Sequence, residues 1–207
     1  ISGDEVSFVG YAFVDDTDQI VTSPEDEATF HEIAHRMQAS VTAWQGGIRA
    51  TGGAIVPEKS HWYLIDFVWT HGHWHYATEA ETPVQISVQD STGTEKMLER
   101  LAPDEACRTL GVRLAPDGNC DDQFKFMVNV ATEWGEHIRT GHLPRHLVWE
   151  SMHTTILRTL LYPLPVTTLS QKQCHQIMAP ILKYGLPCAG IVRTMPRDLV
   201  HGPQRYH

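Results

Sequence analysis

The sequence lacks any hydrophobic stretch long enough to cross a membrane. No run of 18 apolar residues occurs in its 207 positions, whereas a transmembrane helix needs about 20. The first residues, Ile1-Ser2-Gly3-Asp4-Glu5, also lack the basic and apolar regions of a signal peptide. We therefore expect no contact with a membrane and an intracellular location, in the cytoplasm or the nucleus.

Cysteine is scarce, and its spacing excludes the common zinc modules. The chain has four cysteines, no two of which form a CxxC pair: Cys107, Cys120, Cys174 and Cys188. Zinc-finger spacing is absent, and the wide separation does not indicate a disulfide framework. We expect all four to be thiols in a reducing compartment.

Basic residues are few in the first half of the chain. Residues 1–99 carry 4 Lys or Arg against 16 Asp or Glu, a formal charge of −12, whereas residues 100–207 carry 12 and 9, a charge of +3. The total of −9 alone argues against a nucleic-acid partner. The asymmetry instead suits an acidic, metal-holding part joined to a part that contacts phosphates, with chance unevenness as the alternative.

The elements that are present predict an α+β fold in two parts. With 42% hydrophobic residues the chain is globular. Residues 1–118 are rich in strand patterns, and residues 119–207 show helical periodicity. The expected strands cover 6–14, 19–22, 54–56, 61–69, 84–89 and 108–114, and the expected helices cover 24–45, 121–140, 146–162 and 170–184, with Ser23 and Ser170 as N-caps.

The most informative stretch is Phe13-Val14-Asp15-Asp16. An apolar strand over Val6–Val14 is followed by Asp15-Asp16-Thr17-Asp18, which favours a turn, and by a returning strand over 19–22. Two adjacent aspartates on a hairpin turn can present their carboxylates to one divalent cation, because such cations prefer hard oxygen ligands. An acidic, solvated turn is the simpler interpretation of the pair taken alone.

The order of motifs resembles the C-terminal palm and thumb of retrotransposon-type reverse transcriptases. After the aspartate hairpin come a helix, then Gly52-Gly53 with the segment Pro57-Glu58-Lys59, then Leu110-Gly111, then helices. The resemblance covers nearly the whole chain. It implies a partial polymerase palm in 1–118, with antiparallel strands and a packed helix, and a helical thumb-like region in 119–207.

The resemblance also implies roles for single residues. Asp15 and Asp16 would be catalytic ligands of Mg²⁺ or Mn²⁺ in two-metal nucleotidyl transfer. Lys59 would lie near the phosphates of the incoming nucleotide, although a surface lysine on a turn is an equal alternative. Two glycine-containing turns would approach nucleic acid, the first at Gly52 and Gly53 and the second, the primer grip, at Leu110 and Gly111.

The implied partners are an RNA template, a DNA primer and deoxynucleoside triphosphates. The chain departs from the family pattern in one respect, because the third aspartate and the fingers belong to segments before the aspartate hairpin. We therefore expect a fragment that needs the upstream fingers and palm segment of the same parent polypeptide and is inactive alone. The alternative is a non-catalytic remnant that binds nucleic acid or a protein.

Two histidine patterns suggest metal sites of another kind. His31-Glu32-Ile33-Ala34-His35 matches the H-E-x-x-H signature of zinc proteases, but no third-ligand motif follows it. His71, His73 and His75 form a second cluster, with His73 and His75 on one strand face. A polar edge hairpin explains the second cluster more simply.

Overall fold

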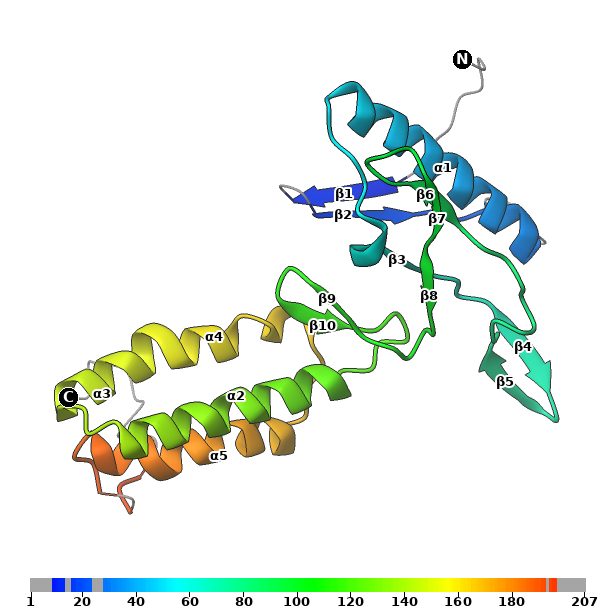
Figure 1. Ribbon diagram of the computed structural model, residues 1–207. Coiled ribbons are helices and arrows are strands. Elements are labelled where there is room, and N and C mark those ends of the chain that lie inside the picture. The colour runs from blue at the N-terminus through cyan, green and yellow to red at the C-terminus, as the bar shows by residue number, and fades with distance from the viewer. Residues whose placement is uncertain (1–8, 14–15, 24–27, 193, 197–207) are drawn as a thin grey trace. The chain divides into compact units, whose positions relative to one another are not determined.

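The computed structural model describes residues 9–13, 16–23, 28–192 and 194–196. The chain is α+β and divides into two compact units. The first unit comprises residues 1–110 with 115–118, and the second comprises 111–114 with 119–207. Figure 1 labels the elements of both units.

The first unit begins with an antiparallel hairpin. Strand β1 (Val9–Phe13) pairs with β2 (Asp16–Ile20), in a register that sets Phe13 opposite Asp16. The connection is therefore Val14-Asp15, which lies outside the described residues. The expected hairpin is present, but the turn is shorter than expected, since Asp16, Thr17 and Asp18 belong to the returning strand.

Helix α1 (Phe30–Ala50) follows the hairpin and begins later than expected. Its N-cap is Thr29 rather than Ser23. Thr29 Oγ1 accepts a hydrogen bond from the backbone N–H of Glu32 at 3.3 Å, while Glu32 Oε2 accepts from the N–H of Thr29 at 2.7 Å. This reciprocal pair is a capping box, which satisfies two unpaired backbone donors and so fixes the first turn.

The same helix also ends later than expected. Gly46 and Gly47 lie inside it, and it ends at Ala50, followed by the C-cap Thr51 and by Gly52, which has φ +85°. The N–H of Gly52 donates to the carbonyl oxygen of Arg49, and that of Gly53 donates to Ile48, both at 3.0 Å. This is a Schellman cap, which needs a left-handed residue that glycine supplies at little cost.

Residues of α1 and of the strands behind it form the core of the first unit. Helical spacing puts Phe30, Ile33, Met37 and Val41 on one face, and these four pack against the cluster that contains buried Ala34. The strand and loop residues of this cluster are Trp62, Leu64, Val84, Ile86 and Leu98.

The remaining strands of this unit are short. They follow the 3₁₀ turn η1 (Pro57–Lys59) and form three pairs. The pair of β3 (His61–Tyr63) and β8 (Glu99–Leu101) is parallel, whereas the pair of β4 (Phe67–Thr70) and β5 (His73–Tyr76) and the pair of β6 (Ser87–Gln89) and β7 (Glu95–Met97) are antiparallel. Strand β9 spans Cys107–Thr109. Residues 54–56 form no strand, and the strand expected over 61–69 is interrupted at 64–66.

Polar side chains of α1 occupy the edge of β6 that β7 leaves open. Gln38 donates through Nε2 to the carbonyl oxygen of Ser87 at 2.9 Å and accepts through Oε1 from the N–H of Ser87 at 2.8 Å. Two turns further along the helix, buried Gln45 donates to the carbonyl oxygen of Gln89 at 2.6 Å. The two amides thus replace a neighbouring strand, which satisfies backbone groups that would otherwise be buried unpaired.

The second unit is helical except for β10 (Val112–Leu114). Its helices are α2 (Asp121–Thr140), the run formed by α3 (Arg145–Ser151), the π-helical η2 (Met152–Ile156) and α4 (Leu157–Leu161), the 3₁₀ turn η3 (Leu164–Val166), and α5 (Gln171–Cys188). The predicted helices over 121–140 and 146–162 are confirmed in outline. Ser170 is the N-cap of α5 as predicted, but the helix continues past Gly185 to Cys188.

Small residues allow the helices of this unit to approach closely. A Cβ built at Gly185 would lie 2.6 Å from Sδ of Met152, a residue that is completely buried. A larger side chain would not fit at this position of α5, so the packing against Met152 requires glycine there. The core contains Met127, Ala131, Ile138, Val148, Met152, Ile156, Leu160, Ile177, Ile181, Leu182 and Leu186.

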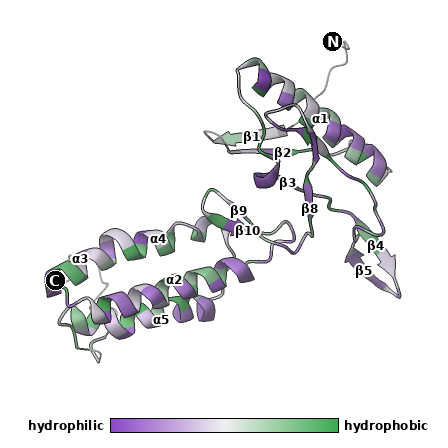
Figure 2. Ribbon diagram, viewed as in Figure 1, coloured by the Kyte–Doolittle hydropathy of each residue, from purple (hydrophilic) through white to green (hydrophobic). Residues whose placement is uncertain are grey.

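Apolar and polar residues alternate along the helices of both units (Figure 2). Within the described residues, no helix has the length and apolar character needed to cross a membrane. No disulfide joins the four cysteines, all of which lie in the described part of the chain.

Candidate functional site

The structure describes one of the two predicted metal ligands, Asp16. Asp16 is the first residue of β2, and Asp15 belongs to the two-residue connection that lies outside the described residues. The two aspartates are neighbours in the sequence, and the register pairs Asp16 with Phe13. Whether both carboxylates bind one ion stays a prediction.

A buried hydrogen bond fastens this hairpin to α1. Ser40 Oγ donates to Oε1 of Gln19 at 2.9 Å, and Ser40 is almost completely buried. Gln19 is three residues beyond Asp16 on the same strand, so the bond fixes the strand that carries the carboxylate. A site of this kind depends on such support, because ligands must be held to within about half an ångström.

Sequence reasoning missed this pair, although one signal was available. Ser40 lies three residues after Met37, at a spacing that puts it on the apolar face of the helix. A single hydroxyl on such a face needs a polar partner, and Gln19 is that partner.

The glycine pair and the lysine follow α1 in a single segment of the first unit. Gly52 and Gly53 have a structural role, the Schellman cap, that is independent of nucleic acid. Pro57 is buried and anchors η1, in which the N–H of Lys59 donates to the carbonyl oxygen of Val56 at 3.1 Å. The Lys59 side chain is exposed, which suits a cation available to a phosphate.

The predicted primer-grip residues form a tight turn between β9 and β10. Leu110 has φ +49° and Gly111 has φ +86°, the pair of positive values found in type I′ turns. The segment before β9 is held by Tyr63, whose hydroxyl donates to the carbonyl oxygen of Glu105 at 3.0 Å. Burial of the Tyr63 ring raises the pKa of its hydroxyl well above the usual range, so this donor keeps its proton.

Within the second unit, Gly111 and β10 lie against helical residues that the sequence did not single out. A Cβ built at Gly111 would be 3.9 Å from Cε1 of Tyr162, an exposed ring. The N–H of Arg113 donates to Oε1 of buried Gln123 at 2.8 Å, and the Arg113 guanidinium stacks 4.1 Å from the ring centre of Phe126. A glycine turn, two aromatic rings and a guanidinium on one unit can contact a sugar–phosphate chain.

The H-E-x-x-H residues lie in the first turns of α1. His31 and His35 are exposed, and Glu32 Oε2 accepts from the backbone N–H of Thr29 at 2.7 Å and from its hydroxyl at 3.0 Å. The backbone N–H of Thr29, and next its hydroxyl, lower the pKa of Glu32. Within the described residues, no group of three His, Cys, Asp or Glu side chains could hold a metal ion. Glu32 has a structural role in the capping box, and zinc binding at His31 and His35 stays a prediction.

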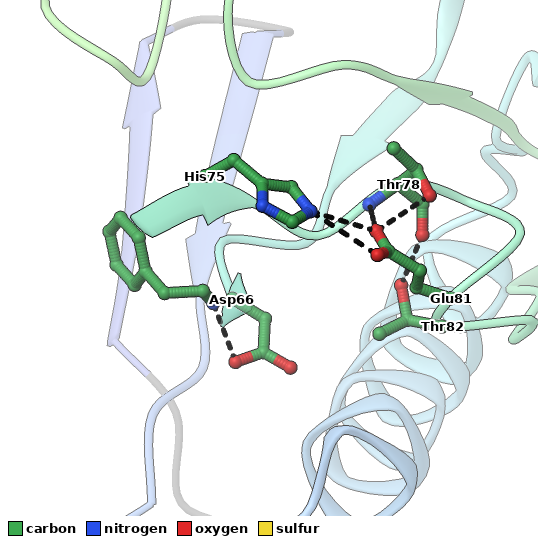
Figure 3. Close-up of polar contacts among 6 residues, drawn as sticks. Asp66, His75, Thr78, Glu81 and Thr82 are labelled. Atoms are coloured by element: carbon green, nitrogen blue, oxygen red, sulfur yellow. Dashed lines mark hydrogen bonds and ion pairs between the residues drawn. The ribbon is translucent and has the colours of Figure 1, made fainter. Parts of the chain in front are cut away.

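The second histidine cluster occupies the β4–β5 hairpin (Figure 3). His71 is at the turn with φ +52°, and His73 is exposed on β5. His75 Nε2 lies 3.2 Å from Oε1 of Glu81, whose carboxylate also accepts from the N–H and hydroxyl of Thr78. The hydrogen bonds from Thr78, and then that from His75, lower the pKa of Glu81.

Comparisons with protein-family models, with curated proteins and with solved structures gave no match. The functional argument therefore rests on the residues themselves and on the order in which they occur.

Proposed function

We propose that this chain is the C-terminal part of the palm, followed by a thumb-like helical region, of a retrotransposon-type RNA-directed DNA polymerase. The observation that carries the proposal is the register of the β1–β2 hairpin, in which Phe13 faces Asp16. In the sequence, Asp15 and Asp16 follow Phe13 and Val14, in the order that the resemblance to the polymerase motif implies.

The order of the following elements supports the same function. Helix α1 packs on the hairpin through Ser40. It ends in the Gly52-Gly53 cap, which leads to Lys59, then to the Leu110-Gly111 turn and to a helical unit. Each element has a simpler explanation alone, and the ordered set is the reason for preferring the polymerase.

The donor set at the hairpin suits Mg²⁺ or Mn²⁺, because both prefer oxygen ligands. When bound there, such ions neutralise charge that develops on the reacting phosphate. Two carboxylates are too few for a two-ion site, and the third would come from an earlier palm strand. Asp15 and Asp16 would orient the ions relative to the primer 3′ hydroxyl.

The chemistry assigned to the chain is nucleotidyl transfer. The primer 3′ oxygen forms a bond to the α-phosphorus, the bond from that phosphorus to the β-phosphate oxygen breaks, and pyrophosphate leaves. Lys59 would stabilise the leaving pyrophosphate and give it a proton, while the proton of the attacking hydroxyl passes to solvent. The turns at Gly52-Gly53 and Leu110-Gly111 would let nucleic acid approach the backbone.

Primer extension on a poly-rA/oligo-dT substrate with Mg²⁺ tests the proposal. The 207-residue chain alone should incorporate no more nucleotide than a blank. The chain joined to the upstream fingers and palm segment of its parent should extend the primer. Absence of synthesis by the joined protein, with the hybrid still bound, would favour the second candidate below.

The second candidate is a non-catalytic module that binds nucleic acid. The observations that favour it are two contacts in the helical unit, the approach of Tyr162 to Gly111 and the stacking of Arg113 on Phe126. Aromatic rings and a guanidinium of this kind can bind a strand without chemistry. Filter binding of a labelled RNA/DNA hybrid, with Arg113→Ala as the variant, measures that activity separately from synthesis.

A further inference from the structure

The β1–β2 hairpin is attached to the first unit mainly by the hydrogen bond between Ser40 and Gln19. Among the residues whose side chains are described, this is the single hydrogen bond between the hairpin and another element. None of the same residues of the hairpin belongs to the hydrophobic cluster of the unit, and Ile20 of β2 is 52% exposed. The place of the hairpin on α1 therefore depends on this bond more than on apolar packing.

Strand alternation determines which side of β2 meets α1. Successive side chains of a strand point to opposite faces. Thr17 and Gln19 are half-buried, whereas Asp18 and Ile20 are exposed, so the face with Gln19 is the one turned toward the helix. Asp16 begins the same strand. A shift of Gln19 relative to α1 would therefore move the backbone of Asp16 as well.

Ser40 is suited to this attachment because it is buried. Its exposed fraction is 1%, so water does not compete with Gln19 for the hydroxyl. A hydrogen bond in such surroundings is electrostatically stronger than one in water, and removal of either partner leaves the other uncompensated. The bond thus fixes one point of β2 at 2.9 Å from one point of α1.

The helix itself is held by other contacts. Gln38 pairs with the backbone of Ser87, and Gln45 donates to the carbonyl oxygen of Gln89, both on β6. Apolar residues of α1 also pack in the hydrophobic cluster. Removal of the Ser40 hydroxyl should therefore leave α1 in place and loosen only the hairpin.

We propose that Ser40 is a positioning residue of the polymerase site, which acts through Gln19 on the strand that begins with Asp16. Groups of a catalytic site must be held to within about half an ångström, and a displacement of about 1 Å can cost about a hundredfold in rate. This role rests on the proposed polymerase function. Its direct effect, the attachment of the hairpin, can be measured without catalysis.

Hydrogen–deuterium exchange of the 207-residue chain measures the attachment. Ser40→Ala should speed the exchange of amides in β1 and β2 and leave those in the middle of α1 unchanged. Gln19→Leu removes the acceptor without emptying the buried position and should have the same effect, whereas Gln19→Glu keeps an acceptor and should restore slow exchange. Equal exchange in the hairpin with and without the bond would overturn the proposal.

Gln45→Leu is the matched control for Ser40→Ala. It removes a buried side-chain hydrogen bond of the same helix, but one that leads to β6. Ser40→Ala should weaken Mn²⁺ binding by the chain about threefold or more, whereas Gln45→Leu should leave it unchanged. Removal of a group that contacts a metal ligand directly costs about ten- to a hundredfold in affinity, and Ser40 acts through a second residue. Equal Mn²⁺ affinities of the two variants would contradict a positioning role.

Primer extension by the chain joined to its upstream fingers and palm segment tests the effect on catalysis. Ser40→Ala should lower kcat about tenfold or more, with KM for the deoxynucleoside triphosphate within about twofold, because the groups are displaced rather than the substrate site removed. Higher Mg²⁺ should restore part of the rate, and Gln45→Leu should keep the full rate.

Two results separate this role from the proposed function. An unchanged kcat in Ser40→Ala, with Asp15→Asn inactive, would overturn the role of Ser40 and leave the polymerase assignment standing. Near-normal synthesis by Asp15→Asn would overturn the assignment, and the role of Ser40 with it.

Discussion

At the scale of single residues, the tip of the β1–β2 hairpin carries the functional argument. Asp15 and Asp16 are adjacent in the sequence, and we expect two neighbouring carboxylates to favour a divalent cation, which prefers oxygen ligands. Without a third carboxylate we expect weak binding, of roughly millimolar affinity, with Mn²⁺ preferred over Mg²⁺. Titration of the chain with Mn²⁺, followed by electron paramagnetic resonance, measures this affinity.

A second adjacent pair of aspartates provides the control for that titration. Asp121 and Asp122 occupy the first turn of α2, where Asp122 lies 3.2 Å from Lys125 Nζ. Replacing both hairpin aspartates by asparagine should remove the Mn²⁺ site, whereas the same replacement at Asp121 and Asp122 should leave it. Equal losses of Mn²⁺ binding in both double variants would mean that the hairpin aspartates do not form a specific metal site.

The capping box at Thr29 leads to a stability prediction. Thr29→Ala should lower the free energy of unfolding by about 1 kcal/mol, the usual loss for an N-cap side chain.

The same capping box makes stability depend on pH. Since folding lowers the pKa of Glu32, the contribution of Glu32 to the free energy of unfolding is present above its unfolded pKa and is lost as the pH falls through its folded pKa. Glu32→Gln should remove this pH dependence with little change at neutral pH, because glutamine also serves in a capping box.

Urea denaturation at several pH values measures both effects.

Purified protein should also contain less than one zinc per chain. Stoichiometric zinc that disappears in His35→Ala would contradict a purely structural role for Glu32 and would restore the protease interpretation.

At the scale of whole elements, two kinds of helical glycine should respond oppositely to alanine. Gly46 lies in α1, and a Cβ added there would have no neighbouring atom within 4 Å, so Gly46→Ala should stabilise by about 0.5–1 kcal/mol. Gly185→Ala would force completely buried Met152 to move and should destabilise by about 1–3 kcal/mol. Urea midpoints of the two variants measure the difference. A stabilised Gly185→Ala protein would show that the second core is loosely packed.

The positions of several elements could be predicted from local signals. The helix over 121–140 and the Ser170 cap depend on short-range patterns, and the structure confirms them. The end of α5 could not be predicted from the sequence, because Gly185 resembles a helix stop. Only the contact with Met152 explains why a glycine occurs inside the helix. Likewise, Ser23-Pro24 resembles a helix start, but the reciprocal bonds of Thr29 and Glu32 determine where α1 begins.

The candidate site was harder to predict than the elements. The sequence identified the aspartates through their neighbours. The position of Ser40 on an apolar helix face indicated that it needs a polar partner but not that this partner is Gln19, and nothing in the sequence indicated that Tyr162 lies beside Gly111. Both contacts join residues far apart in the chain. Such pairs follow from tertiary packing, which local periodicity does not contain.

At the scale of the whole molecule, each unit has its own hydrophobic cluster. The first cluster joins α1 to the short strands, and the second joins the helices that follow residue 119. In the proposed polymerase, the first unit would carry the chemistry and the second would contact the primer–template duplex. The charge difference between the two halves of the sequence agrees with that division of roles.

The most direct test of the polymerase assignment is primer extension by the complete parent protein carrying Asp15→Asn. The asparagine keeps the shape of the side chain but loses its charge, so the fold should be unchanged. We predict a fall in rate of at least roughly a thousandfold, equivalent to several kcal/mol of transition-state stabilisation. Asp121→Asn, the matched control, should retain the rate. A near-normal rate with Asp15→Asn would contradict the account, because the active site would then lie elsewhere.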